Sequence, residues 1–288
     1  MLTPCIWTDF LTELEPEDAI RMIGEAGFQQ VEFGSGHEKN FLEGKEDEGK
    51  RLKRIVHAAE RAGVSIVQMH GRLCNFMDEN AEENIAWAHR SMERAAMLGV
   101  RWVVFHPAQS PGYGTSLEEW EYTRVRNVEI FRAFLKTAER VGVGIAIENM
   151  LGHRPRFGAP ASDLLWLLDQ LKSDRVGICW DTGHANVSNV KQGQAIRAIN
   201  KRLVALHIDD NDGSSDQHLM PLRGRIDWDD VLTALREIDY HGPFDLELPG
   251  ERKVTPHAAR PAQLRYLYQL SRVMLAPGFK VAQETKAG

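Results

Sequence analysis

Residues 206–228, LHIDDNDGSSDQHLMPLRGRIDW, combine a short apolar run with many carboxylate and imidazole side chains. These side chains belong to His207, Asp209, Asp210, Asp212, Asp216 and His218. Oxygen and imidazole ligands that gather just past a strand end are what a divalent cation requires. A solvated acidic loop with Gly-Ser turns is the alternative that this stretch alone leaves open. In either case the segment is too polar to be expected in the core.

Other apolar, strand-like runs also end on a histidine or a carboxylate. The terminal residues are His70, His106, Glu148, Asp181, His207 and Glu247, and nearby loops add His184, Asp216 and His218. Any one of these residues alone could have a purely structural role. Nine such donors at one end of a sheet include carboxylates that would repel each other and raise each other's pKa unless a cation neutralised them. We therefore expect a divalent-metal site held by carboxylates and histidine.

The elements that position these donors alternate between strands and helices along the chain. The expected strands are 3–7, 30–33, 64–69, 102–105, 144–147, 176–180, 203–206 and 244–246. The expected helices are 16–26, 47–62, 82–98, 117–141, 162–171, 194–202, 227–240 and 256–275. Strand–helix repetition with near-continuous apolar strands favours an α/β fold, a single (β/α)8 TIM barrel over residues 1–276. Residues 277–288 are expected to be a C-terminal tail.

An open doubly wound sheet is the alternative fold. It usually carries a glycine-rich phosphate-binding loop after its first strand. Here the first strand is followed by Trp-Thr-Asp-Phe at residues 7–10, so that signature is missing.

Composition and charge limit the class of protein. The 288 residues carry a formal net charge of −6, which gives no support for nucleic-acid binding. The 3 cysteines form no CxxC pair and indicate neither a disulfide framework nor a thiolate zinc site. We expect no signal peptide and no membrane-spanning segment, and therefore a cytoplasmic protein.

Five motifs follow one another from the fourth expected strand to the eighth: VVFHPA, IENM, WDTGHAN, LHIDDNDGSSDQHLMPLRGRIDW and LELPG. With these motifs the whole chain resembles the xylose isomerase-like TIM-barrel superfamily. This superfamily includes sugar phosphate isomerases and epimerases, inosose dehydratases, ketose 3-epimerases and, more distantly, endonuclease IV.

The resemblance to the epimerase-like members implies one divalent metal, Mn, Co, Mg or Zn, held by Glu148, Asp181, His207 and Glu247. It also implies that Glu148 and Glu247 are catalytic. A metal-bound carbonyl and its neighbouring hydroxyl acidify the C–H bond between them, so one glutamate can remove that proton and the other can return one to an enediolate. The predicted function is a metal-dependent sugar, sugar-phosphate or inosose isomerase or epimerase. Dehydratase or lyase chemistry of the same superfamily stays open.

Endonuclease IV supplies an alternative interpretation with up to three zinc ions. Its nine donors would fall on His70, His106, Glu148, Asp181, His184, His207, Asp216, His218 and Glu247. A phosphodiesterase of this kind needs a basic DNA-binding surface, whereas this chain is acidic. We therefore expect a small carbohydrate substrate and no nucleic-acid partner. A metal-binding barrel without turnover is a further alternative, which the presence of both glutamates disfavours.

The remaining polar residues are expected to bind substrate or additional metal: His70, His106, His184, Asp216, His218 and Arg223. Residues 221–224 read Pro-Leu-Arg-Gly, where many sugar-branch members have Pro-Gly-x-Gly. Arg223 would therefore either contact an anionic substrate group or remain solvated. The sequence leaves open the sugar, the metal and the oligomeric state, although relatives often form homo-oligomers.

Overall fold

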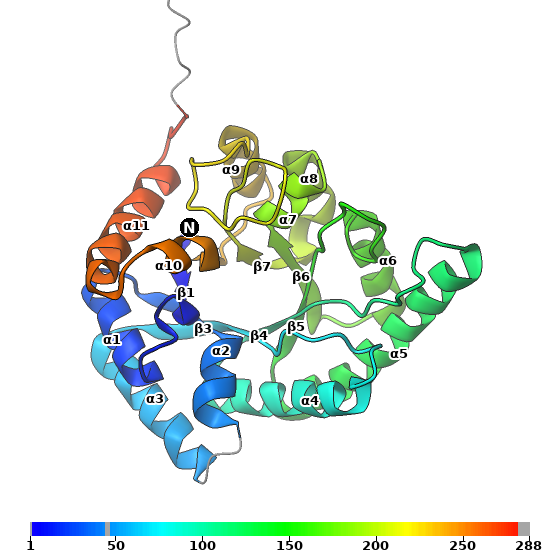
Figure 1. Ribbon diagram of the computed structural model, residues 1–288, viewed down its shortest axis with the longest axis horizontal. Coiled ribbons are helices and arrows are strands. Elements are labelled where there is room, and N and C mark those ends of the chain that lie inside the picture. Colours follow the sequence, from blue (N-terminus) through cyan, green and yellow to red (C-terminus); the bar gives the residue numbers. More distant parts are fainter. Residues whose placement is uncertain (1, 44–46, 282–288) are drawn as a thin grey trace, which may run out of the picture.

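The computed structural model describes residues 2–43 and 47–281, which form a ring of parallel strands surrounded by helices (Figure 1). The strands are β1 (Thr3–Trp7), β2 (Gln30–Phe33), β3 (Ser65–His70), β4 (Trp102–Phe105), β5 (Gly144–Glu148), β6 (Val176–Asp181), β7 (Leu203–His207) and β8 (Pro243–Leu246). Their order in the sheet is β7-β6-β5-β4-β3-β2-β1-β8. Just beyond β7, the Ile208 N–H donates to the carbonyl of Asp245 at 2.7 Å, and the Glu247 N–H donates to the Ile208 carbonyl at 3.2 Å. These two bonds join the ends of the sheet, so the predicted (β/α)8 barrel is confirmed.

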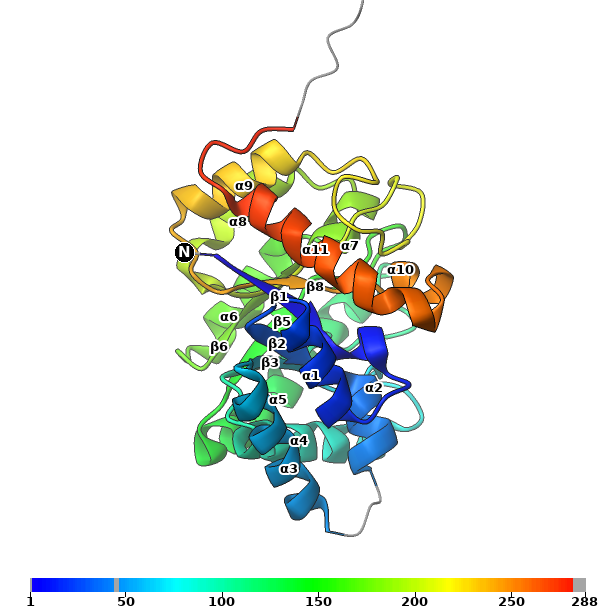
Figure 2. The same cartoon turned by 90° about the vertical axis from the view of Figure 1, so that its left-hand side faces the viewer.

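The helices surround the ring of strands, and the longer ones cover its apolar sides (Figure 2). They are α1 (Pro16–Glu25), α2 (Ser35–His37), α3 (Glu48–Ala62), α4 (Ala81–Met97), α5 (Leu117–Val141), α6 (Ala161–Leu171), α7 (Thr182–Val187), α8 (Gln192–Ile199), α9 (Trp228–Glu237), α10 (Pro249–Val254) and α11 (Arg260–Leu275). Two of them, α3 and α5, end at Gly63 and Gly142, where φ is +66° and +86°. Glycine ends a helix in this left-handed conformation because it has no Cβ to clash.

Several segments differ from the sequence prediction, among them residues 35–42, which form α2 and a π-helical turn where the sequence predicts no helix. The expected helix 256–275 begins only at Arg260, because a separate helix, α10, and a short 3-10 turn precede it. His184 was expected in a loop, but it lies in α7, which begins directly after β6. The side chain of Asp181 caps this helix by accepting a hydrogen bond from the His184 N–H at 2.6 Å.

Two further predictions concern the chain end and membranes. Residues 277–281 follow α11 without helix or strand, and the rest of the predicted tail, residues 282–288, lies outside the described residues. Among the helices in residues 2–43 and 47–281, none is long and apolar enough to cross a membrane.

Candidate metal centre

The first polar residues after β7 are buried, contrary to the prediction that the segment is too polar for the core, whereas residues 212–215 are exposed. Asp209, Asp210 and Asn211 have no exposed surface. The carboxylate of Asp210 accepts a hydrogen bond from Trp228 Nε1 at 2.9 Å, and its backbone pairs with Leu219 through two bonds of 2.8 Å. Hydrogen bonds of this kind make burial of a polar segment tolerable. The pairing also turns the chain back, so that Asp216 and His218 return to the mouth of the barrel.

Four donors meet where β5, β6, β7 and β8 end. They are Glu148, Asp181, His207 and Glu247, and one ligand atom from each lies within 4.8 Å of the others. His207 Nδ1 lies 3.0 Å from Oε1 of Glu148 and 3.5 Å from Oε2 of Glu247. All four side chains are buried. Three carboxylates and one imidazole are a donor set that a hard or borderline divalent cation accepts.

The surroundings of the Asp181 carboxylate show whether this four-donor group fits a cation. One carboxylate oxygen, Oδ1, is occupied by the His184 N–H. The other, Oδ2, is buried and has no hydrogen-bond partner in the part of the chain that the structure describes. Burial raises the pKa of Asp181 to about 6, and repulsion from Glu148 adds to this rise although His184 opposes it. A buried carboxylate oxygen without a partner is costly, and a bound cation would provide the missing contact. The residues therefore fit a divalent metal.

Glu148 is the centre of the charge network. Its Oε2 atom lies 3.1 Å from His106 Nε2 and 3.4 Å from His70 Nε2. Burial alone would raise the pKa of Glu148, but the charges of His207 and His106 hold it well below its usual range. Burial alone would lower the pKa of His70, yet Glu148 raises it to about 9. Without a cation, protonated histidines therefore balance the carboxylates, and a metal would have to displace protons.

A second donor set lies beside the first. His184, Asp216 and His218 also bring one ligand atom each within 4.8 Å of one another. Asp216 Oδ2 lies 2.9 Å from His218 Nε2 and 3.5 Å from His184 Nε2. His184 Nδ1 lies 3.5 Å from Glu148 Oε1 and so joins the two sets. Burial alone would lower the pKa of His184, but Asp181 and Asp216 raise it to about 10.

The nine predicted strand-end and loop donors therefore form one contiguous network, which we call the donor cluster. Its members are His70, His106, Glu148, Asp181, His184, His207, Asp216, His218 and Glu247. Arg223 has different neighbours. Its side chain is 55% exposed, and Nη1 lies 3.0 Å from Oε1 of Glu251.

Two buried residues outside the predicted set hold the donors in place. Oε2 of Glu32 lies 3.1 Å from His207 Nε2, on the side of the ring opposite Glu148. The Asn149 side chain accepts from the Asp181 N–H at 2.6 Å and donates to the Asp181 carbonyl at 3.0 Å. The signal for Glu32 is a charged residue within the short strand QVEF, whereas the predicted donors all lie at strand ends or in the loops that follow them.

Glu32 carries its charge next to another buried carboxyl group, Asp245. Burial and the charge of Glu32 raise the pKa of Asp245 well above its usual value. Burial alone would also raise the pKa of Glu32, but His207 and a hydrogen bond from Asp245 lower it to about 2. Two adjacent buried carboxyl groups repel each other when both are charged, so one of them, Asp245, keeps its proton. The negative charge therefore stays on Glu32, where it faces His207.

Comparison with known proteins gives the class of this barrel. Residues 20–270 match the family described as xylose isomerase-like TIM barrel, and the chain belongs to this family.

The relatives align with different shares of this chain. An uncharacterized protein, y4fM, of Sinorhizobium fredii is 28% identical over 257 residues, which are 85% of this chain and 74% of the relative. A D-psicose 3-epimerase of Enterocloster bolteae is 29% identical over 124 residues, which are 43% of this chain and 40% of the relative. The structure of the IOLI protein with a zinc atom has a TM-score of 0.77 at 20% identity and covers 97% of this chain and 100% of its own. Sugar epimerases and inosose isomerases are thus among the relatives.

Proposed function

We propose that this chain is a divalent-metal-dependent sugar isomerase or epimerase in which Glu148 and Glu247 transfer protons to and from carbon. The arrangement of the two glutamates carries the proposal. Glu148 ends β5 and Glu247 follows β8, and β6 and β7 lie between these strands in the ring. Both carboxylates nevertheless reach the same imidazole, His207. Two bases at one site, on separate strands, suit proton removal from one side of a carbon and return from another.

A divalent cation bound by the four donors would polarise a carbonyl and its neighbouring hydroxyl and so acidify the C–H bond between them. Glu247 then takes the proton, and Glu148 returns one to the enediolate, with the order set by the substrate face. Glu32 and Glu148 fix the ring of His207 between them. His184 offers a hydrogen bond to a sugar hydroxyl. Relatives named as D-psicose 3-epimerase and inosose isomerase support this class of chemistry.

Two single substitutions test the proposal. Glu148→Gln and Glu247→Gln should each lower kcat for ketoses or inososes by about 100-fold or more, because general acid–base catalysis contributes about 10²–10⁴-fold. Incorporation of solvent deuterium at the substrate carbon should fall in parallel. Glu118→Gln, on the exposed start of α5, is the matched control. Metal content is measured on every variant, because both glutamates are also proposed ligands. If both variants retain the parent rate, the two-base mechanism is wrong.

The second donor set supports one alternative function. His184, Asp216 and His218 could hold further zinc, as in an endonuclease IV-like phosphodiesterase. Elemental analysis of protein purified without chelators separates the two proposals. One Mn, Co, Mg or Zn per chain supports the sugar enzyme. About three zinc per chain would favour the phosphodiesterase, and abasic-site DNA would then be the first substrate to assay. The sugar-enzyme proposal includes a small-molecule carbohydrate substrate and a cytoplasmic location, and it leaves the oligomeric state open.

A further inference from the structure

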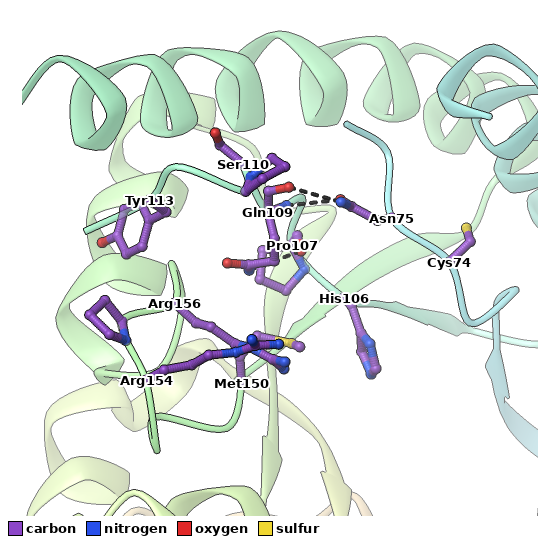
Figure 3. A pocket seen from close by; sticks show the side chains of 12 residues that line it. Cys74, Asn75, His106, Pro107, Gln109, Ser110, Tyr113, Met150, Arg154 and Arg156 are labelled. Carbon is purple, nitrogen blue, oxygen red and sulfur yellow. Dashed lines mark hydrogen bonds between the residues drawn. The ribbon is translucent and has the colours of Figure 1, made fainter. Parts of the chain in front are cut away.

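A cavity of about 550 Å³ opens beside the donor cluster, among the loops that follow β3, β4 and β5 (Figure 3). Its volume is in the range that accommodates small-molecule ligands. His106 belongs both to the cavity wall and to the donor cluster, since its Nε2 lies 3.1 Å from Glu148 Oε2. A substrate whose reacting carbon lies at Glu148 could therefore extend its distal end into this cavity.

Two arginines of the loop between β5 and α6, Arg154 and Arg156, line the cavity. Figure 3 shows both side chains extending toward Met150, with His106 beyond it. Within residues 2–43 and 47–281, neither guanidinium has an ion-pair or hydrogen-bond partner. Burial lowers the pKa of Arg156, and repulsion from Arg154 lowers it further. Two neighbouring positive charges thus face the cavity without a carboxylate to balance them.

The loop that carries these arginines is held in place by hydrogen bonds. The side chain of Gln109, from the loop after β4, accepts from the Phe157 N–H at 3.0 Å and donates to the Phe157 carbonyl at 2.8 Å. The Met150 N–H donates to the Gly158 carbonyl at 3.1 Å and closes the base of the loop. Arg156 therefore projects from a fixed backbone, which reduces the entropy lost when a ligand binds.

We propose that Arg154 and Arg156 bind an anionic group of the substrate, so that the substrate is a sugar with a phosphate ester or a carboxylate and not a neutral ketose. Guanidinium groups bind the paired oxygens of both anions. A phosphate monoester carries a charge of about −1.5 to −2 at pH 7 and balances two guanidiniums better than a single carboxylate does. Arg223, in contrast, already lies against Glu251. The sugar part of this inference rests on the proposed function, whereas the anion site does not.

Direct binding tests the anion site without reference to turnover. Inorganic phosphate and acetate are titrated calorimetrically into the metal-loaded protein and into the double variant Arg154→Gln/Arg156→Gln. Arg265→Gln, on the exposed side of α11, removes a positive charge elsewhere and is the control. We expect the double variant to bind phosphate about tenfold more weakly or worse, a change of about 1.4 kcal/mol, with an unchanged melting temperature. Stronger binding of acetate than of phosphate would assign the site to a carboxylate. The anion site is wrong if the wild-type protein binds neither anion, or if the double variant binds them equally well.

Turnover tests the substrate class. The double variant should lower kcat/KM for a ketose phosphate at least about tenfold more than it lowers kcat/KM for the neutral ketose. If Glu148→Gln and Glu247→Gln both keep full activity while the arginine-dependent phosphate binding persists, the proposed mechanism fails and the anion site stands. If the glutamate variants lose activity but the double variant lowers kcat/KM equally for both ketoses, the proposed anion site is wrong and the proposed mechanism stands. A short DNA duplex that displaces phosphate only when both arginines are present would overturn the sugar assignment.

Discussion

Replacement of Glu32 by Gln is expected to weaken divalent-metal binding, although Glu32 is not one of the four donors. Both oxygens of Glu32 lie near His207 Nε2, at 3.1 and 3.4 Å, and both side chains are fully buried. This contact leaves Nδ1 of His207 directed at Glu148 and Glu247. A carboxylate on the far nitrogen of a metal-binding histidine fixes the tautomer and makes the ring a better ligand.

The size of the effect follows from the kind of contact that is lost. Removal of such a supporting carboxylate typically costs about 10- to 100-fold in metal affinity. Gln is nearly the same size as Glu, and its carbonyl can still accept from Nε2, so only the charge disappears. We therefore expect the lower end of the range, about tenfold or 1.4 kcal/mol.

Calorimetric titration of Mn²⁺ or Zn²⁺ into metal-free protein measures the change. Glu118→Gln removes an exposed charge from α5 and should bind metal as the parent does. The melting temperature of metal-free Glu32→Gln shows whether the fold is retained. If Glu32→Gln weakens metal binding by less than about twofold, and not by the expected 10-fold, the role of Glu32 in orienting His207 is refuted.

Further predictions concern His70, Asn149 and Cys74. Burial alone would lower the pKa of His70, but Glu148 raises it to about 9 in the metal-free protein, compared with 6.5 for an unperturbed histidine. Protonated His70 therefore stabilises the metal-free fold fully below pH 6.5, and this contribution is lost as the pH rises through 9. Metal affinity should rise over the same interval, with proton release measured in buffers of different ionisation enthalpy; a pH-independent affinity would contradict this. Asn149→Ala should lower the free energy of unfolding by about 1–3 kcal/mol, because the buried backbone of Asp181 loses two partners. Urea denaturation measures this loss, and a change below about 0.5 kcal/mol, the size of a neutral surface substitution, would contradict it. Burial raises the pKa of Cys74 to about 12, so iodoacetamide should modify this thiol slowly at pH 7.5 and rapidly in urea; equal rates in both conditions would be the contrary result.

Much of the fold and the candidate centre could be predicted because both depend on local patterns. The alternation of apolar runs with helical segments predicts a parallel barrel, and parallel strands place all their C-terminal ends at one mouth. Residues that end separate strands, such as Glu148 and Asp181, are therefore brought together by topology alone. The structure adds that these donors lie within 4.8 Å of each other together with His207 and Glu247.

Contacts between distant elements could not be predicted from the same patterns. Glu32 on β2 reaches His207 on β7 across the interior of the barrel, 175 residues away in sequence. The segment after β7 looked solvated because its composition is polar. The burial of its first residues, Asp209 to Asn211, depends on partners such as Trp228, which donates to Asp210 only after the chain has turned back.

The sequence by itself determined the order of the eight strands and of the main helices between them, and the identity of the strand-end donors, since apolar periodicity and residue type are local properties. Only the tertiary structure decided which charges are paired. Arg223 lies against Glu251, whereas Arg154 and Arg156 face the cavity without a partner among the described residues. The physical reason is that an ion pair depends on distances of a few ångströms between side chains from separate loops, and the packing of the whole barrel sets those distances.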